Sequence, residues 1–215
     1  MSAEGSTIDP PMQRVGTLTA MPMLSAADRL PHRPTRVVVG GTSGSSKTTL
    51  ARRIAAAIGA SHTEIDSLHH GSGWTVRPEF LADVAALAGR PQWVTEYQYP
   101  DARPLLLARC DLVVYLLLPR WLVMSRVVRR TIGRSLRREV LWNGNLEPPL
   151  RTFFTDRDHV VRAAWRSHGR NAARIENIRV ARPDVPIVVL TSHREIAHWL
   201  RGPLAIAVAN GGSPG

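Results

Sequence analysis

The sequence has little of several features that would narrow its class. Its single cysteine, Cys110, excludes a disulfide framework and a cysteine-based zinc site. Its longest apolar run, residues 112–118, is far shorter than the ~20 residues that a membrane-spanning helix needs. No basic stretch followed by an apolar segment opens the chain, so we expect no secretory signal. The sequence therefore favours a cytoplasmic protein that does not insert into membranes.

Lysine is almost absent. Of 28 basic residues one is a lysine, Lys47, and the rest are arginines; with 17 acidic residues the formal net charge is +11. This charge indicates a phosphate-bearing partner, either polymeric nucleic acid or a small phosphorylated molecule. A length of 215 residues, 44% of them hydrophobic, is typical of one α/β domain with tails and excludes global disorder.

Short β-branched runs alternate with helical patterns between residues 35 and 201. We expect strands at 36–39, 62–65, 93–95, 112–118 and 187–190, and helices at 48–58, 78–87, 105–109, 121–132, 156–178 and 194–200. This alternation predicts an α/β fold with a parallel sheet of about five strands and helices on both faces. Residues 1–34, which are rich in proline, are interpreted as a flexible leader, and residues 202–215 as a flexible tail.

A phosphate-binding loop follows the first predicted strand. Its sequence fits the P-loop pattern, Gly, four residues, Gly, Lys and Ser or Thr, except that Ser46 replaces the second glycine. Small residues let backbone N–H groups curl around a phosphate at the positive end of the next helix. Lys47 is expected to contact the β- and γ-phosphates, and Thr48 to ligate Mg²⁺. The predicted ATP-binding residues are Gly41, Thr42, Ser43, Gly44, Ser45, Ser46, Lys47, Thr48 and Thr49.

Residues 38–55, 66–74, 119–145 and 165–170 together resemble the P-loop kinases related to adenylate kinase. The nearest branch is the one called topology-modulation or adenylate-kinase-like proteins. The resemblance implies a three-layer P-loop NTPase fold, a mobile acceptor-binding segment and an arginine-rich lid at about residues 130–156. Two departures are Leu117, where an acidic residue is usual, and residues 96–99, which read Glu-Tyr-Gln-Tyr where Asp-Gly-Asn-Tyr is common.

Two carboxylates follow predicted strands, at the edge where ligands of parallel sheets bind. Asp66 is expected to ligate the acceptor hydroxyl or to act as its general base. Glu96 is expected to hold Mg²⁺ through water and to border the acceptor. A helix cap or a solvated loop acid is the alternative for each. Trp74 is interpreted either as stacking on a planar acceptor or as plain packing, and the pair His69–His70 as exposed loop histidines.

Between residues 120 and 170 there are 12 arginines and 4 acidic residues, which places a net charge of +8 in one segment. Arg130 and Arg134 lie one helical turn apart, and we expect both to contact the transferred phosphate from a closing lid. The more C-terminal stripe of Arg162, Arg166, Arg170 and Arg174 is interpreted as a solvated helix face.

The leading hypothesis is an ATP- and Mg²⁺-dependent kinase that transfers the γ-phosphate to a small acceptor, with a nucleotide or nucleoside as first choice. Its catalytic residues would be Lys47, Asp66, Arg130 and Arg134. The second hypothesis is a nucleic-acid-binding or regulatory P-loop protein whose basic lid grips backbone phosphates. A third is a nucleotide hydrolase, against which Leu117 counts. Both a monomer and a dimer remain open.

Overall fold

A computed structural model describes residues 23–126, 129 and 170–211 of the chain. The predicted lid at about residues 130–156, with Arg130 and Arg134, lies outside the described residues. So do Arg162 and Arg166, the first 22 residues and the last 4.

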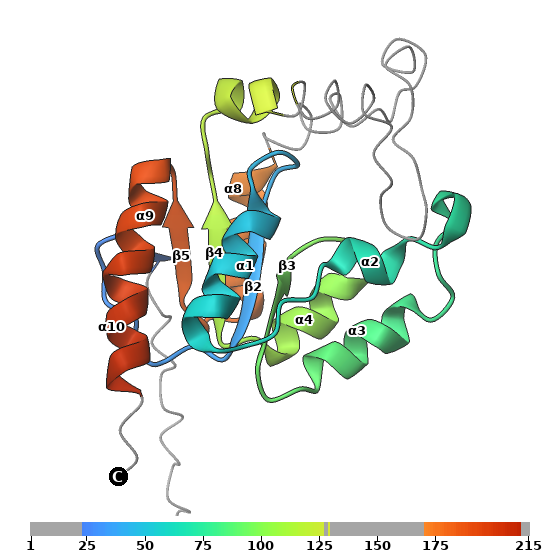
Figure 1. Ribbon diagram of the computed structural model, residues 1–215, viewed down its shortest axis with the longest axis horizontal. Coiled ribbons are helices and arrows are strands. Elements are labelled where there is room, and N and C mark those ends of the chain that lie inside the picture. The colour runs from blue at the N-terminus through green and yellow to red at the C-terminus, as the bar shows by residue number, and fades with distance from the viewer. Residues whose placement is uncertain (1–22, 127–128, 130–169, 212–215) are drawn as a thin grey trace, which may run out of the picture.

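The described residues form a single parallel sheet of five strands in the order β1-β5-β4-β2-β3 (Figure 1). Every neighbouring pair of strands runs parallel. The predicted α/β fold with a parallel sheet of about five strands is therefore confirmed. The strands are β1 (Met23–Leu24), β2 (Arg36–Gly41), β3 (Trp93–Glu96), β4 (Leu112–Leu116) and β5 (Ile187–Leu190).

The register of the central strand brings the candidate site residues to one edge of the sheet. β2 lies between β3 and β4, with Val39 opposite Glu96 and Gly41 opposite Leu116. The loop after β2 and the carboxylate that ends β3 therefore share the carboxyl edge, where parallel α/β sheets bind ligands.

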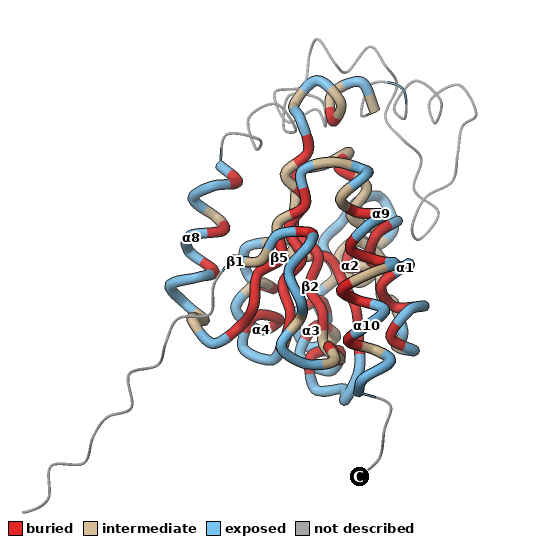
Figure 2. The backbone as a smooth tube through the Cα atoms, turned by 90° about the vertical axis from the view of Figure 1, so that its left-hand side faces the viewer, coloured by how far each residue is buried: buried red, intermediate tan, exposed pale blue. Residues whose placement is uncertain are grey.

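Helices cover both faces of the sheet, as predicted. On one face lie α1 (Lys47–Ile58), α9 (His193–Arg201) and α10 (Pro203–Asn210); on the other lie α3 (Phe80–Ala88), α4 (Ala102–Arg109) and α8 (Asn171–Ala181). Figure 2 shows α8 and α4 on the opposite side of the strands from α9 and α10. No described helix is long and apolar enough to cross a bilayer.

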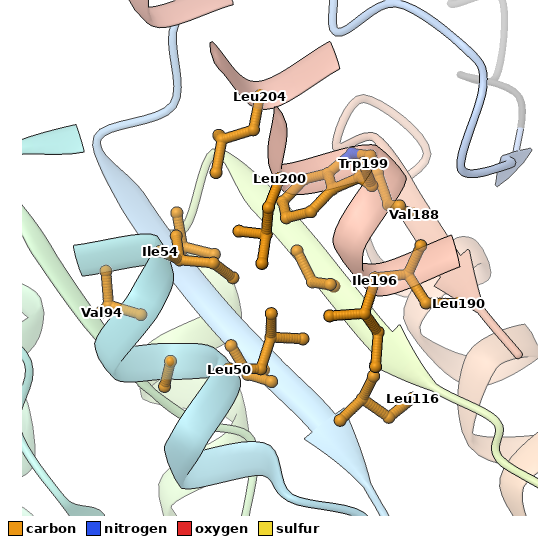
Figure 3. Close-up of a cluster of buried hydrophobic side chains, with 14 of the residues drawn as sticks. Leu50, Ile54, Val94, Leu116, Val188, Leu190, Ile196, Trp199, Leu200 and Leu204 are labelled. Atoms are coloured by element: carbon orange, nitrogen blue, oxygen red, sulfur yellow. The ribbon is translucent and has the colours of Figure 1, made fainter. Parts of the chain in front are cut away.

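Successive side chains along each strand point to opposite faces of the sheet, and this divides the core into two clusters. Val37 and Val39 face α1, whereas Val38 between them packs against the α3 and α4 side. In the first cluster, Leu200 of α9 lies between Ile54 of α1 and the fully buried Trp199 (Figure 3). Burial on both faces explains why the strands read as continuous apolar runs rather than alternating ones.

The predicted strand at residues 62–65 is wrong. His62 forms only an isolated bridge with Val94, and the chain turns into α2 (Ile65–His69), which is followed by the short 3₁₀ helix η1 (Ser72–Trp74). The Ile65 amide donates to a carboxylate oxygen of Glu96 instead of to a neighbouring strand. Asp66 is therefore a residue of α2 and does not follow a strand.

The predicted domain boundaries at residues 34 and 202 differ from the structure. Met23–Leu24 forms the edge strand β1 beside β5, and residues 203–210 form α10, in which Leu204 is fully buried. A strand of two residues is too short to show a hydrophobic period. The helix α10 was missed because proline usually indicates a helix end, whereas Pro203 occupies the first turn, where proline is tolerated.

Cys110 gives a direct test of this packing. The side chain is 2% exposed, and burial raises the pKa of its thiol to about 12. Because the thiolate is the reactive form, we expect alkylation at pH 8 to be at least about 100-fold slower in the folded protein than in denaturant. A colorimetric thiol assay measures this rate without interference, since the chain has no other cysteine. Rapid labelling of the native protein would contradict the packing around α4.

Candidate active site

The loop between β2 and α1 turns through two glycines with positive φ angles. Gly41 and Gly44 have φ angles of 140° and 78°, a region that L-residues rarely adopt. A Cβ at Gly41 would lie 2.9 Å from the Leu116 carbonyl oxygen, so the loop also passes too close to β4 for a larger residue. Both glycines therefore suit the turn, and Gly41 is also required for its packing against the sheet.

Ser46 adopts the conformation for which glycine is usual. It is the N-cap of α1 with φ 68° and ψ 32°, in the left-handed region, and its hydroxyl does not cap the helix. The hydroxyl instead accepts a hydrogen bond of 3.0 Å from the guanidinium of Arg126. Ser46 thus preserves the loop geometry with backbone strain and adds a contact that glycine could not make.

Two substitutions separate the strain at Ser46 from its hydrogen bond. Ser46→Ala and Ser46→Gly both remove the contact with Arg126, but only Gly relieves the left-handed conformation. We expect Ser46→Gly to have a free energy of unfolding about 1 kcal/mol higher than Ser46→Ala. Urea denaturation of the two variants measures this difference. Equal stabilities would show that residue 46 is not held in the left-handed region.

The first turn of α1 has features that favour the binding of an anion. Its first turn contains no acidic residue, and no side chain caps it. Lys47 donates from Nζ to the Thr42 carbonyl oxygen at 3.0 Å, and the Ser45 hydroxyl donates to the same oxygen at 2.7 Å. The ammonium group is therefore folded onto the loop, next to backbone N–H groups that would hold a phosphate.

Glu96 lies beneath this loop and is 3% exposed. Its carboxylate is 3.1 Å from His62 Nε2 and accepts from the Ile65 amide at 3.1 Å. Burial raises the pKa of Glu96, but hydrogen bonds from His62, Ile65 and Thr48, with the charge of His62, outweigh it and hold the pKa below its usual value. An ionised carboxylate thus stands beside the Thr48 hydroxyl, as the predicted Mg²⁺ pair requires.

Asp66 is positioned by the segment that follows β3. Its Oδ1 accepts from Gln98 Nε2 at 2.8 Å and from the Tyr99 hydroxyl at 2.6 Å. Burial, the charge of Asp66 and their hydrogen bond raise the pKa of Tyr99, so the phenol keeps its proton and donates it to the carboxylate. Both donors use Oδ1. Within the described residues no hydrogen bond to Oδ2 is found.

Aromatic rings surround this carboxylate. The His69 ring stacks on Tyr99 with centroids 3.7 Å apart, and His70 Nε2 lies 3.0 Å from the Tyr99 hydroxyl. Trp74 meets the edge of His70 at 5.1 Å and is 37% exposed. The interpretation of His69 and His70 as exposed loop residues is therefore wrong, because both are half-buried in an aromatic cluster with Asp66. Among the described residues, no group of side chains could hold a metal ion by itself.

Backbone strain is concentrated at this edge. Among the described residues, the non-glycine residues with positive φ are Ser46, Trp74 and Tyr99, with φ angles of 68°, 61° and 56°. One forms the phosphate loop and the other two belong to the aromatic cluster around Asp66. Strained backbone conformations persist only where the surrounding structure enforces them, and they are concentrated at functional sites.

Arg126 and His193 bridge two elements above the loop. Residues 120–126 are helical, and the Arg126 guanidinium, which donates to Ser46, is also 2.5 Å from His193 Nε2 at the start of α9. Burial and the charge of Arg126 lower the pKa of His193, which favours the neutral imidazole, the form that can accept a hydrogen bond from the guanidinium. Sequence reasoning did not single out His193, whose contact with Arg126 joins residues 67 apart along the chain.

The sequence predicted site residues in the loop and at Asp66, Trp74 and Glu96; the structure places Asp66 and Trp74 in one cluster and Glu96 beside Thr48. It missed the groups that hold them: His62 on Glu96, Gln98 and Tyr99 on Asp66, and Arg126 on Ser46. Each pair is separated by 32–80 residues along the chain, so no local motif could reveal it.

No protein-family model and no curated protein matches the chain. Among solved structures, it is similar to a gluconokinase from Sinorhizobium meliloti 1021, with 20% identity, a TM-score of 0.45 and coverage of 83% of this chain and 94% of that one. It is also similar to a shikimate kinase from Acinetobacter baumannii bound to shikimate, with 19% identity, a TM-score of 0.46 and coverage of 83% and 96%.

Proposed function

We propose that the protein is an ATP-dependent phosphotransferase that moves the γ-phosphate of ATP to a small acceptor. The observation that carries this proposal is the phosphate loop, with its two positive-φ glycines, the left-handed Ser46 and the ammonium of Lys47 folded onto it. A strand, a loop of this shape and a helix with an uncapped start form the arrangement that holds the phosphates of a nucleotide.

The loop residues divide the work of binding the nucleotide. Backbone N–H groups of residues 42–48 would bind the β-phosphate oxygens, and Lys47 would move from the Thr42 carbonyl to the β- and γ-phosphates. The Thr48 hydroxyl and the ionised Glu96 beside it fit a hard cation such as Mg²⁺. When bound, Mg²⁺ neutralises charge on the phosphate oxygens.

Asp66 would act on the acceptor. Gln98 and Tyr99 hold its Oδ1, which leaves Oδ2 to accept a hydrogen bond from the acceptor hydroxyl and to take its proton as the phosphoryl group is transferred. Trp74, more than a third exposed beside His70, offers a face on which a planar acceptor would stack. A nucleotide or nucleoside fits this combination of a carboxylate and aromatic rings. The lid arginines Arg130 and Arg134 remain predictions, in keeping with the adenylate-kinase-related branch.

Incubation of the full chain with γ-³²P-ATP and a panel of nucleotides, nucleosides and sugars tests the proposal. We expect labelling of at least one acceptor, dependent on Mg²⁺ and absent from Lys47→Ala. If no acceptor is labelled and Lys47→Ala binds ATP as tightly as the wild type, the proposal is wrong.

The alternative, nucleic-acid binding, rests on the arginines of residues 120–170, most of which lie outside the described residues. It predicts affinity for DNA or RNA that falls steeply with salt, by about one log–log slope unit for each phosphate contacted. A weak and salt-independent affinity would exclude it.

A further inference from the structure

A chain of hydrogen-bonding side chains leads from Asp66 into the aromatic cluster. The Tyr99 hydroxyl donates to Asp66 Oδ1 at 2.6 Å, and His70 Nε2 lies 3.0 Å from the same hydroxyl oxygen. The second nitrogen of that ring, His70 Nδ1, lies 3.4 Å from His69 Nδ1. The candidate base is therefore linked through Tyr99 to a histidine to which the proposed function gives no role.

The single hydroxyl hydrogen of Tyr99 gives this chain a direction. Because the phenol donates that hydrogen to Asp66, its oxygen accepts from His70, and His70 Nε2 must carry a hydrogen. In the neutral His70 ring Nδ1 is then the acceptor, so the hydrogen shared with His69 belongs to His69 Nδ1. Each hydrogen bond in the chain therefore points toward the carboxylate.

The hydrogen bond from His70 decides where Tyr99 directs its own hydrogen. A phenol can turn its O–H group toward either of two neighbours, and here the neighbours are Asp66 Oδ1 and His70 Nε2. A hydrogen on Nε2 closes the second choice and leaves the carboxylate as the acceptor of the two. A donor to the phenol oxygen also polarises its O–H group, which strengthens the hydrogen bond to Asp66.

Ring packing fixes the positions of these side chains. The His69 and Tyr99 rings stack with their planes 7° apart, and Phe80 meets both in T-shaped contacts, with centroids 4.8 and 5.4 Å away. Tyr99 has a φ angle of 56°, in the left-handed region that a bulky residue rarely adopts. The protein thus maintains a strained backbone at the residue whose hydroxyl contacts the candidate base, and strain of this kind is typical of functional sites.

We propose that His70 is a positioning residue for Asp66. By donating from Nε2 to the Tyr99 oxygen, it keeps the phenol hydrogen on Asp66 Oδ1 and so leaves Oδ2 for the acceptor hydroxyl. The role of Asp66 as a base rests on the proposed function, whereas the direction of the hydrogen bonds does not. Because His70 acts through Tyr99, its removal should change the step in which the base takes the proton and not the binding of ATP.

NMR of the full chain with ¹⁵N-labelled histidine rings tests the direction of the hydrogen bonds without any turnover. Long-range ¹H–¹⁵N correlations at pH 8, where histidine is ordinarily neutral, show which ring nitrogen carries the hydrogen. We expect the hydrogen on Nε2 in His70 and on Nδ1 in His69, so that two adjacent histidines have opposite tautomers. His70→Gln identifies the His70 signals by their loss. Tyr99→Phe, which removes the acceptor oxygen, should shift the His70 Nε2 resonance.

Steady-state kinetics with the acceptor that the γ-³²P-ATP panel identifies test the positioning role. We expect His70→Leu to lower kcat about tenfold, the loss expected for one buried hydrogen bond, with KM for ATP unchanged. His70→Gln, whose amide nitrogen can donate to Tyr99 in place of Nε2, should recover most of that loss. Tyr99→Phe should lose at least as much as His70→Leu, and the double variant no more than Tyr99→Phe, because the two residues act as one chain.

His198→Leu is the matched control, because it removes an exposed histidine of α9, outside the aromatic cluster, and should change neither kcat nor the His70 tautomer.

Three results would overturn the inference: a hydrogen on Nδ1 rather than Nε2 of His70 in the wild type, a wild-type kcat in His70→Leu, or equal losses in His70→Leu and His70→Gln. If no acceptor is labelled while His70 carries its hydrogen on Nε2, the proposed function fails, and the role of Asp66 with it, but the direction of the hydrogen bonds stands. The two failures are therefore distinguishable.

Discussion

Replacement of Lys47 by alanine is expected to lower phosphoryl transfer about 100- to 1000-fold, the loss typical of one preorganised donor at a developing charge. Lys47 is the chain's sole lysine, and its ammonium lies on the phosphate loop, 3.0 Å from the Thr42 carbonyl oxygen. Its loss leaves the β- and γ-phosphates without a mobile cation, so ATP affinity should also fall at least about tenfold. Initial rates with labelled ATP and calorimetric titration of ATP·Mg²⁺ measure the two effects.

Arg53→Ala is the matched control for this variant. Arg53 is an exposed cation on the same helix, so its removal changes the net charge equally and should leave rate and affinity unchanged. An equal loss in both variants would mean that Lys47 acts through general charge. An unchanged affinity in Lys47→Ala would contradict the assignment of the loop.

Replacement of Asp66 by asparagine is expected to lower transfer to the labelled acceptor about 100- to 10,000-fold while ATP binding is retained, as for removal of a general base. The amide keeps the shape of the carboxylate but cannot take the proton of an acceptor hydroxyl. The rate constant and the affinity for ATP are measured separately, because a base acts on the chemical step and Asp66 is not among the groups proposed to hold the nucleotide.

Asp101→Asn provides the comparison. Asp101 is an exposed acid at the start of α4 that makes no side-chain cap, and its replacement should not change the rate. If Asp66→Asn transfers phosphate at the wild-type rate, Asp66 is only a structural partner of Gln98 and Tyr99. If it loses ATP binding as well, its contribution lies in folding of the site.

The sheet was predictable because its strands are buried on both faces. Residues 112–116 and 187–190 are apolar without a break, and such runs carry their own signal. The prediction was wrong at residues 62–65, although their β-propensity favours a strand. The Ile65 amide instead donates a hydrogen bond to Glu96, 31 residues away. The prediction also missed β1 and α10, whose order depends on packing against β5 and α1.

The candidate site also has a part that local sequence predicts and a part that depends on contacts between distant segments. The phosphate loop is a local structure, so its glycines, Lys47 and Thr48 could be recognised from spacing alone. Even at the departure from the pattern, Ser46, the backbone takes the left-handed conformation that glycine adopts most easily. Which groups support Asp66 and Glu96 depends on contacts between distant segments. Tyr99, 33 residues from Asp66, matches the family pattern by residue type, but its hydrogen bond to Asp66 could not be read from the sequence.

The central claim, that the loop after β2 binds the phosphates of ATP, is tested most directly by amide NMR of the ¹⁵N-labelled chain on addition of Mg²⁺ and a non-hydrolysable ATP analogue. We expect the largest chemical-shift changes at Gly44, Ser45, Ser46, Lys47 and Thr48, whose N–H groups form the loop and the start of α1. The same titration with Lys47→Ala should leave them nearly unshifted. Saturating analogue that moves none of these amides, or moves only residues far from the loop, would contradict the assignment.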